Sequence, residues 1–147
     1  MLTSKRRLKT DISNESANAT EVILERFQGD IIFDSHSISS SDFRKWMTTL
    51  DEGFGRAPIT FSKCWIPHHR ARIITPSNEF VIEFCFSCDE MQTTTSNRVY
   101  IPNDWVGSSK NLFSVYGISD KAPTHEEVTA YRQQQIDFAE QDAAPNR

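Results

Sequence analysis

The chain has 147 residues, of which 37% are hydrophobic and 24% charged, and its formal net charge is −4. This length suits a single domain, and no run of about 18 apolar residues is present that would predict a transmembrane helix. Three cysteines are too few for a scaffold of several disulfide bridges. The mild acidity argues against non-specific nucleic-acid binding, which needs a basic surface.

Both ends of the chain have the composition of flexible segments. Residues 1–19 are rich in Ser, Asn and Thr and carry a basic cluster over residues 5–9. A charge run this short usually lies in solvent, so we expect a flexible segment there and another over residues 139–147. No apolar stretch follows the basic cluster, so the chain as it stands lacks a secretory signal and is predicted to be cytoplasmic. The domain is expected over residues 20–138.

The first half of this domain predicts a hairpin and a helix. Apolar runs at 22–24 and 31–33 flank a Gln-Gly-Asp turn, which favours a hairpin over residues 21–33, with helix over 21–27 as the alternative. Residues 39–53 predict a helix with an apolar stripe at the spacing i, i+3, i+4 and i+7. The stripe consists of Phe43, Trp46, Met47 and Leu50.

The second half predicts a central hairpin followed by two helices. Residues 69–75 and 79–87 alternate between apolar and polar side chains around a Pro-Ser-Asn turn, which indicates two antiparallel strands. A third strand is expected over 93–101, and a short helix over 109–116 that Gly117 closes. A surface helix is expected to begin at Thr124, with Glu127 as its capping-box partner.

These elements predict an α+β fold. It would consist of a small antiparallel sheet with a central hairpin at about residues 69–88 and one or two helices packed on it.

The chemistry-bearing residues gather at one end of the central hairpin. Cys64, His68 and His69 enter its first strand, and Cys85 and Cys88 close its second. The two ends of an antiparallel hairpin meet in space, so three thiols and one histidine are expected close together. Cys64, His69, Cys85 and Cys88 are therefore candidate ligands of a structural zinc ion, with His68 as the alternative histidine.

Three other interpretations use the same residues. Cys85 and Cys88 continue a Phe-rich strand, where buried cysteines act as small apolar side chains. Asp89 and Glu90 follow Cys88 and disfavour its thiolate, which argues against a thioredoxin-like redox pair. An enzyme using Cys64 or a catalytic metal would need a cleft beside His68 and His69 with a reachable thiol.

The two Cys-containing segments resemble a pattern of small, largely uncharacterised bacterial proteins. In these a Cys-aromatic-x-Pro-x-His stretch leads into a hairpin that ends in Cys-Phe-x-Cys, matching Cys64, Pro67, His69, Cys85 and Cys88 here. The resemblance covers about residues 64–88. It implies that His69, rather than His68, is the matching histidine, and it implies no activity.

The leading functional hypothesis is a small, cytoplasmic, non-enzymatic protein that binds another protein. No nucleotide-binding, zinc-protease or serine-hydrolase motif is present in the sequence. An immunity- or antitoxin-like inhibitor is one version, because an acidic domain can neutralise a basic toxin by charge complementarity. No nucleic-acid or membrane partner is expected. The candidate acidic residues are Asp51, Glu52, Asp89, Glu90, Glu126 and Glu127. A zinc-binding module is the runner-up and a Cys- or metal-dependent enzyme the third hypothesis.

Overall fold

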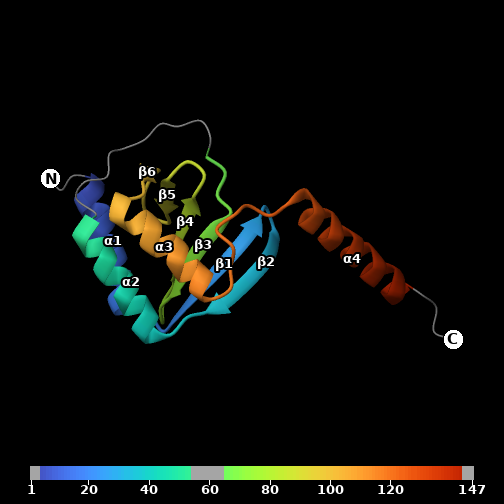
Figure 1. Cartoon of the computed structure of the whole chain (residues 1–147). Coiled ribbons are helices and arrows are strands. Elements are labelled where there is room, and N and C mark those ends of the chain that lie inside the picture. Colours follow the sequence, from blue (N-terminus) through green and yellow to red (C-terminus); the bar gives the residue numbers. More distant parts are fainter. Residues whose placement is uncertain (1–3, 54–64, 144–147) are drawn as a thin grey trace.

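A computed structural model describes residues 4–53 and 65–143 of the chain (Figure 1). The elements in these stretches follow in the order α1 (Ser4–Ala17), β1 (Glu21–Gln28), β2 (Ile31–Ser37), α2 (Ser40–Gly53), β3 (His69–Ile74), β4 (Glu79–Cys85), β5 (Glu90–Thr93), β6 (Val99–Tyr100), α3 (Asn103–Val115) and α4 (His125–Ala143).

The strands form one six-stranded antiparallel sheet in the order β2-β1-β3-β4-β5-β6. The hairpin of β3 and β4 lies in the middle, with His69 opposite Phe84 and Ile74 opposite Glu79. The predicted α+β fold with a central hairpin is therefore confirmed, as is the hairpin over residues 21–33, which is β1 and β2.

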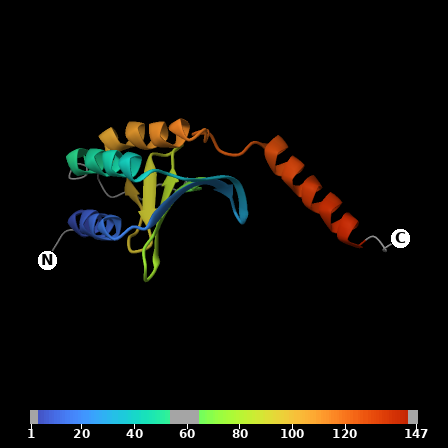
Figure 2. The ribbon, with the colours of Figure 1, turned by 90° about the horizontal axis from the view of Figure 1, so that it is seen from below.

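Helices α2 and α3 lie side by side over one face of the sheet, and α1 lies next to α2 (Figures 1 and 2). The indoles of Trp46 and Trp105 stack at 4.7 Å between α2 and α3, and both pack on Phe84 of β4. Trp46 donates its indole hydrogen to Ser109 Oγ, and Trp105 donates to the Trp46 carbonyl. This aromatic cluster joins the two helices to the middle of the sheet.

The C-terminal end of α3 and the start of α4 agree with their local signals, whereas α3 begins at Asn103 and not at residue 109 as expected. Gly117 has a φ of 75°, and the Ile118 N–H donates to the Phe113 carbonyl, which is the Schellman closure of α3. At the start of α4, the Glu127 N–H donates to Thr124 Oγ1 and the Thr124 N–H donates to Glu127 Oε1. The predicted capping box is thus confirmed.

The strand expected over residues 93–101 is mostly a turn, since β5 ends at Thr93 and β6 consists of Val99 and Tyr100. The Ser96 N–H donates to the Thr93 carbonyl, and the two side-chain hydroxyls also bond to each other at 2.9 Å. These bonds reverse the chain between β5 and β6, so two short strands replace one.

The N-terminal segment differs from its prediction. Residues 4–17 of the expected flexible segment form α1, and Ile12 is fully buried in the same core as α2 and the sheet. Ser16 Oγ contacts Met47 of α2 at 3.2 Å. Two large apolar residues in a polar stretch, Leu8 and Ile12, are too few to give a clear periodic signal, so tertiary packing shows that this helix belongs to the core.

Helix α4 projects from the body (Figure 1). Residues 139–143, expected in a flexible tail, are part of this helix. Within the described stretches, no helix has the length and apolar character needed to cross a bilayer.

Candidate functional site at the end of the central hairpin

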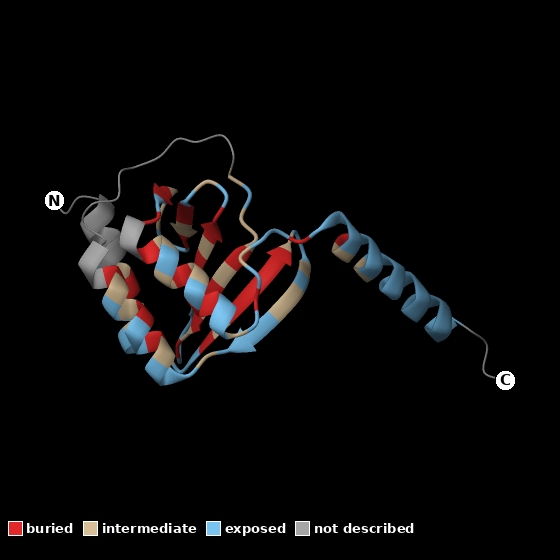
Figure 3. Ribbon diagram, in the orientation of Figure 1, coloured by how far each residue is buried: buried red, intermediate tan, exposed pale blue. Residues whose placement is uncertain are grey.

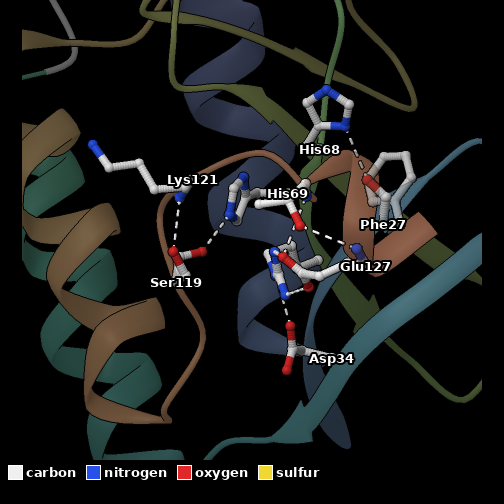
Figure 4. Close-up of polar contacts among 9 residues, drawn as sticks. Phe27, Asp34, His68, His69, Ser119, Lys121 and Glu127 are labelled. Atoms are coloured by element: carbon white, nitrogen blue, oxygen red, sulfur yellow. Dashed lines mark hydrogen bonds and ion pairs between the residues drawn. The ribbon is translucent and has the colours of Figure 1, made fainter. Parts of the chain in front are cut away.

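His69 begins β3 and is 2% exposed. Its Nε2 lies 2.7 Å from the Ser119 carbonyl oxygen, so Nε2 carries the proton and donates it (Figure 4). The ring packs on Phe86 at 4.8 Å and on Phe113 at 5.2 Å. Burial lowers the pKa of His69 to about 4, which keeps the imidazole neutral near pH 7.

The structure separates His69 from Cys85. His69 and Phe84 are register partners, so both side chains point to the face that the helices cover. Cys85 follows Phe84 and pairs with Glu90, which places it on the opposite face. The alternation of Phe80, Ile82 and Phe84 in the sequence already indicates that Phe84 and Cys85 lie on opposite faces of the strand.

The predicted zinc ligands are therefore only partly brought together. His69 lies apart from Cys85 and Cys88, and its Nε2 is engaged by Ser119. Cys64 lies outside the described residues. Among the side chains that the structure describes, no three of His, Cys, Asp or Glu are grouped so that they could hold a metal ion. Zinc binding that includes Cys64 stays a prediction.

Cys85 and Cys88 do lie together, in the turn that joins β4 to β5. The Cys88 N–H donates to the Cys85 carbonyl at 3.3 Å, and the Ser87 hydroxyl lies 3.3 Å from Cys85 Sγ. Both sulfurs are thiols. Burial raises the pKa of Cys85, but hydrogen bonds from the side chains of Cys88 and Ser87 and from the Ile66 backbone lower it below its usual value.

A pocket of about 170 Å³ opens beside the two histidines. His68 points Nδ1 at the Phe27 carbonyl oxygen, 3.0 Å away. The enzyme hypothesis required a cleft here, and one exists, but the thiol that it required, Cys64, lies outside the described residues. The lining residues are Ile66, His68, His69, Phe86, Ser87, Lys110, Asp120, Lys121 and Ala122.

A buried arginine next to this pocket fixes the start of α4. Arg26 of β1 is 8% exposed, and its Nε donates to Asp34 at 2.7 Å while its two terminal nitrogens donate to Glu127 (Figure 4). The guanidinium lowers the pKa of the Glu127 carboxyl. Tyr131 adds an edge-to-face contact with Phe33 of β2. The ion pair of Arg26 with Asp34 was not predicted from the sequence. An arginine in the apolar strand β1 does indicate that an acidic partner lies nearby, because buried charged residues are almost always paired.

Beyond Tyr131, α4 leaves the protein body. Each residue from 132 to 143 is exposed (Figure 3). Ile136 is 50% exposed and Phe138 63% exposed. The helix contains five acidic residues and one arginine, a formal charge of −4, which equals that of the whole chain. The rest of the chain is therefore neutral in sum.

The acidic residues singled out in the sequence are not one surface. Glu90 is fully buried, with Arg98 Nη1 3.9 Å from its carboxylate, and Glu127 is held by Arg26. Asp89 and Glu126 are exposed. No side chain is described for Asp51 or Glu52. The exposed acidity that the structure does gather lies on α4, at Glu126, Asp137, Glu140 and Asp142.

The comparisons with known proteins reveal similarity of fold. No family model and no curated protein matches the chain. Among solved structures, the crystal structure of a putative lipoprotein from Clostridium perfringens is similar, with a TM-score of 0.53 and 14% sequence identity. The match covers 80% of this chain and 99% of that chain. At this identity the similarity shows the fold alone.

Proposed function

We propose that this chain is a non-enzymatic binding protein and that its partner is another protein, which binds α4. The observation that carries this proposal is the run of exposed helical residues from 132 to 143. Most helices in folded proteins are stabilised by packing an apolar face, and isolated helices shorter than about 12–15 residues are marginal in water. This part of α4 packs on nothing in the described chain, so a partner that covers it would stabilise it.

The exposed aromatic residue on α4 supports an apolar contact. Phe138 follows Tyr131 by seven residues, so it lies on the same side of the helix as Tyr131 and Val128, which contact the body. Large aromatic side chains are enriched among the residues that dominate binding energy. Phe138 is therefore the anchor that we assign to the partner interface.

The charge of α4 selects the kind of partner. The part of α4 that we assign to the partner, residues 132–143, contains three acidic residues and Arg132, a formal charge of −2, and this charge attracts a basic surface and speeds association with it. The same charge repels a second copy of α4, which disfavours a dimer through this helix. An immunity- or antitoxin-like inhibitor of a basic protein fits this charge distribution.

The cellular location of the chain belongs to this proposal as well. The sequence predicts the cytoplasm, whereas the protein that shares the fold is described as a putative lipoprotein. We retain the cytoplasm as the proposed location and take an extracytoplasmic location as the alternative. Fractionation of cells that express the protein from its own gene distinguishes the two locations. The protein should be found either with a cytoplasmic marker or with an envelope marker.

Site-specific cross-linking tests the proposal. A photo-reactive amino acid is placed at Gln134 on α4 in the chain expressed in its source organism, and in parallel at Asp30 in the β1–β2 turn. Both positions are exposed, so neither substitution disturbs the core. We expect a protein adduct from position 134 and none from position 30, and we expect the cross-linked protein to be basic.

The identified partner is then purified and its affinity measured as a function of salt. The proposal predicts that the dissociation constant rises with ionic strength, because exposed charges are screened over about 8–10 Å. The proposal would be contradicted if adducts formed equally from positions 134 and 30, or if the dissociation constant did not change with salt concentration.

A further inference from the structure

The β4–β5 turn holds two thiols at the spacing of a disulfide. The bond from the Cys88 N–H to the Cys85 carbonyl closes a four-residue turn, and such a turn brings its end Cα atoms within about 7 Å. Disulfides span Cα separations of about 4.4–6.8 Å. Cys88 Sγ lies 3.8 Å from the Cys85 carbonyl oxygen, so this side chain folds back over the turn towards Cys85.

The turn is held in this shape by contacts on both sides. Asp89 has a φ of 54°, the left-handed conformation that ends the turn, and its carbonyl accepts the Ile101 N–H at 2.7 Å. Cys85 pairs with Glu90 in the strands that the turn joins. The two cysteines are thus ordered before any bond forms between them, which lowers the entropic cost of closing the ring.

The two thiols differ in access to solvent. Cys85 is 1% exposed, whereas Cys88 is partly exposed. A small reagent therefore reaches Cys88 first, although Asp89 and Glu90, which follow Cys88, disfavour its thiolate and slow this step. The Ser87 hydroxyl, 3.3 Å from Cys85 Sγ, is placed to stabilise negative charge on the inner sulfur.

From this geometry we infer that Cys85 and Cys88 form a reversible intramolecular disulfide, with Cys88 as the entry thiol and Cys85 as the resolving thiol. The oxidant is a low-molecular-weight disulfide such as glutathione disulfide. This site goes beyond the proposed binding function and does not depend on it, because the turn lies on β4 and β5 and the binding surface lies on α4.

The reaction proceeds by two thiol–disulfide exchanges. The Cys88 thiolate attacks one sulfur of glutathione disulfide, forming a mixed disulfide and releasing one glutathione thiolate. The Cys85 thiolate then attacks Cys88 Sγ, the bond to glutathione breaks, and the second glutathione thiolate leaves. Two electrons pass from the protein dithiol to the small disulfide, and the two protons lost by the protein end on the two glutathione molecules.

The test uses the full chain in buffers of defined glutathione to glutathione-disulfide ratio, with a chelator present so that bound metal cannot mask the thiols. Samples are quenched with N-ethylmaleimide and analysed by intact mass and peptide mapping. We expect the oxidised chain to carry two N-ethylmaleimide adducts fewer than the reduced chain and to have lost two hydrogens, which is one disulfide. The bond should join Cys85 to Cys88, Cys64 should remain alkylated, and dithiothreitol should reverse the change.

Variants separate the two roles. In Cys85→Ser, glutathione should remain attached to Cys88, because the resolving thiol is gone, and in Cys88→Ser the inner thiol should stay unmodified. Cys64→Ser is the matched control and should form the disulfide as the parent does. In the parent chain, N-ethylmaleimide should modify Cys88 about tenfold faster than Cys85, a measurement that needs no variant.

Three outcomes would overturn the inference. They are a disulfide that contains Cys64, a glutathione adduct on Cys88 that persists in the parent chain, and thiols that stay reduced in excess glutathione disulfide.

Discussion

The core around His69 holds its imidazole in the neutral form. Nε2 donates to the Ser119 carbonyl, and Phe86 and Phe113 pack against the ring. Protonation would place a charge among aromatic rings, so burial is the main reason that the pKa of His69 falls to about 4. The residue thereby ties the start of β3 to the segment that follows α3.

This neutral state predicts a loss of stability in acid. The pKa of His69 is about 4 in the folded chain and 6.5 ordinarily. Between pH 6.5 and 4, His69 is therefore protonated in the unfolded chain and neutral in the folded chain. Stability contributed by His69 is complete above pH 6.5 and falls as the pH drops towards 4, by at most about 3 kcal/mol. Urea unfolding at several pH values measures this slope.

His69→Gln provides the comparison, because the amide can donate to the Ser119 carbonyl and has no proton to gain in this range. The slope between pH 6.5 and 4 should be smaller in the variant. Equal slopes in the two chains would show that other groups cause the acid loss.

At the scale of elements, Ile12 packs α1 into the core, among the side chains of this helix that the structure describes. Ile12 is fully buried, whereas the neighbouring Ser13 is exposed. Replacing a fully buried Ile by Ala usually costs about 2–5 kcal/mol, since it removes apolar contacts and leaves a cavity. We expect Ile12→Ala to lower the free energy of unfolding by about 2–4 kcal/mol.

Ser13→Ala is the control in the same turn and should change the stability by less than about 0.5 kcal/mol. Urea denaturation monitored by the fluorescence of the stacked tryptophans, Trp46 and Trp105, reports both values. Equal and small effects at the two positions would mean that α1 does not contribute to the core in solution.

The elements that the sequence predicted are those with complete local signals. The stripe from Phe43 to Leu50 predicted α2, and Thr124 with Glu127 predicted the start of α4, because periodicity and caps act over a few residues. Packing of α1 depends on Ile12 meeting α2 and the sheet, which no local pattern encodes.

Only part of the candidate site could be predicted from the sequence, because the rest depends on contacts between distant residues. The backbones of His69 and Cys85 do lie at the same end of the hairpin, with Cys88 in the turn that follows. Which face each side chain takes depends on register: His69 pairs with Phe84, and Cys85 falls one position later. The meeting of the two hairpin ends could be predicted from the sequence, whereas the face that each side chain takes required the register, and zinc binding that includes Cys64 stays a prediction.

At the scale of the whole molecule, a neutral body carries an acidic helix that leaves it (Figure 1). Arg26 links β1, Asp34 of β2 and Glu127 of α4, so the first turn of the helix is fixed to the sheet while the rest is presented to solvent. The central claim is that a basic protein partner binds this exposed part of α4.

The affinity of the cross-linked partner for Phe138→Ala tests this claim most directly, with Ile32→Ala as the control. Ile32 is also an exposed apolar residue, 42% exposed against 63% for Phe138, but it lies on the edge strand β2. Isothermal titration with the purified partner should give a dissociation constant at least about tenfold higher for Phe138→Ala than for the parent chain, and an unchanged one for Ile32→Ala. Equal affinities for the parent chain and Phe138→Ala would contradict the claim.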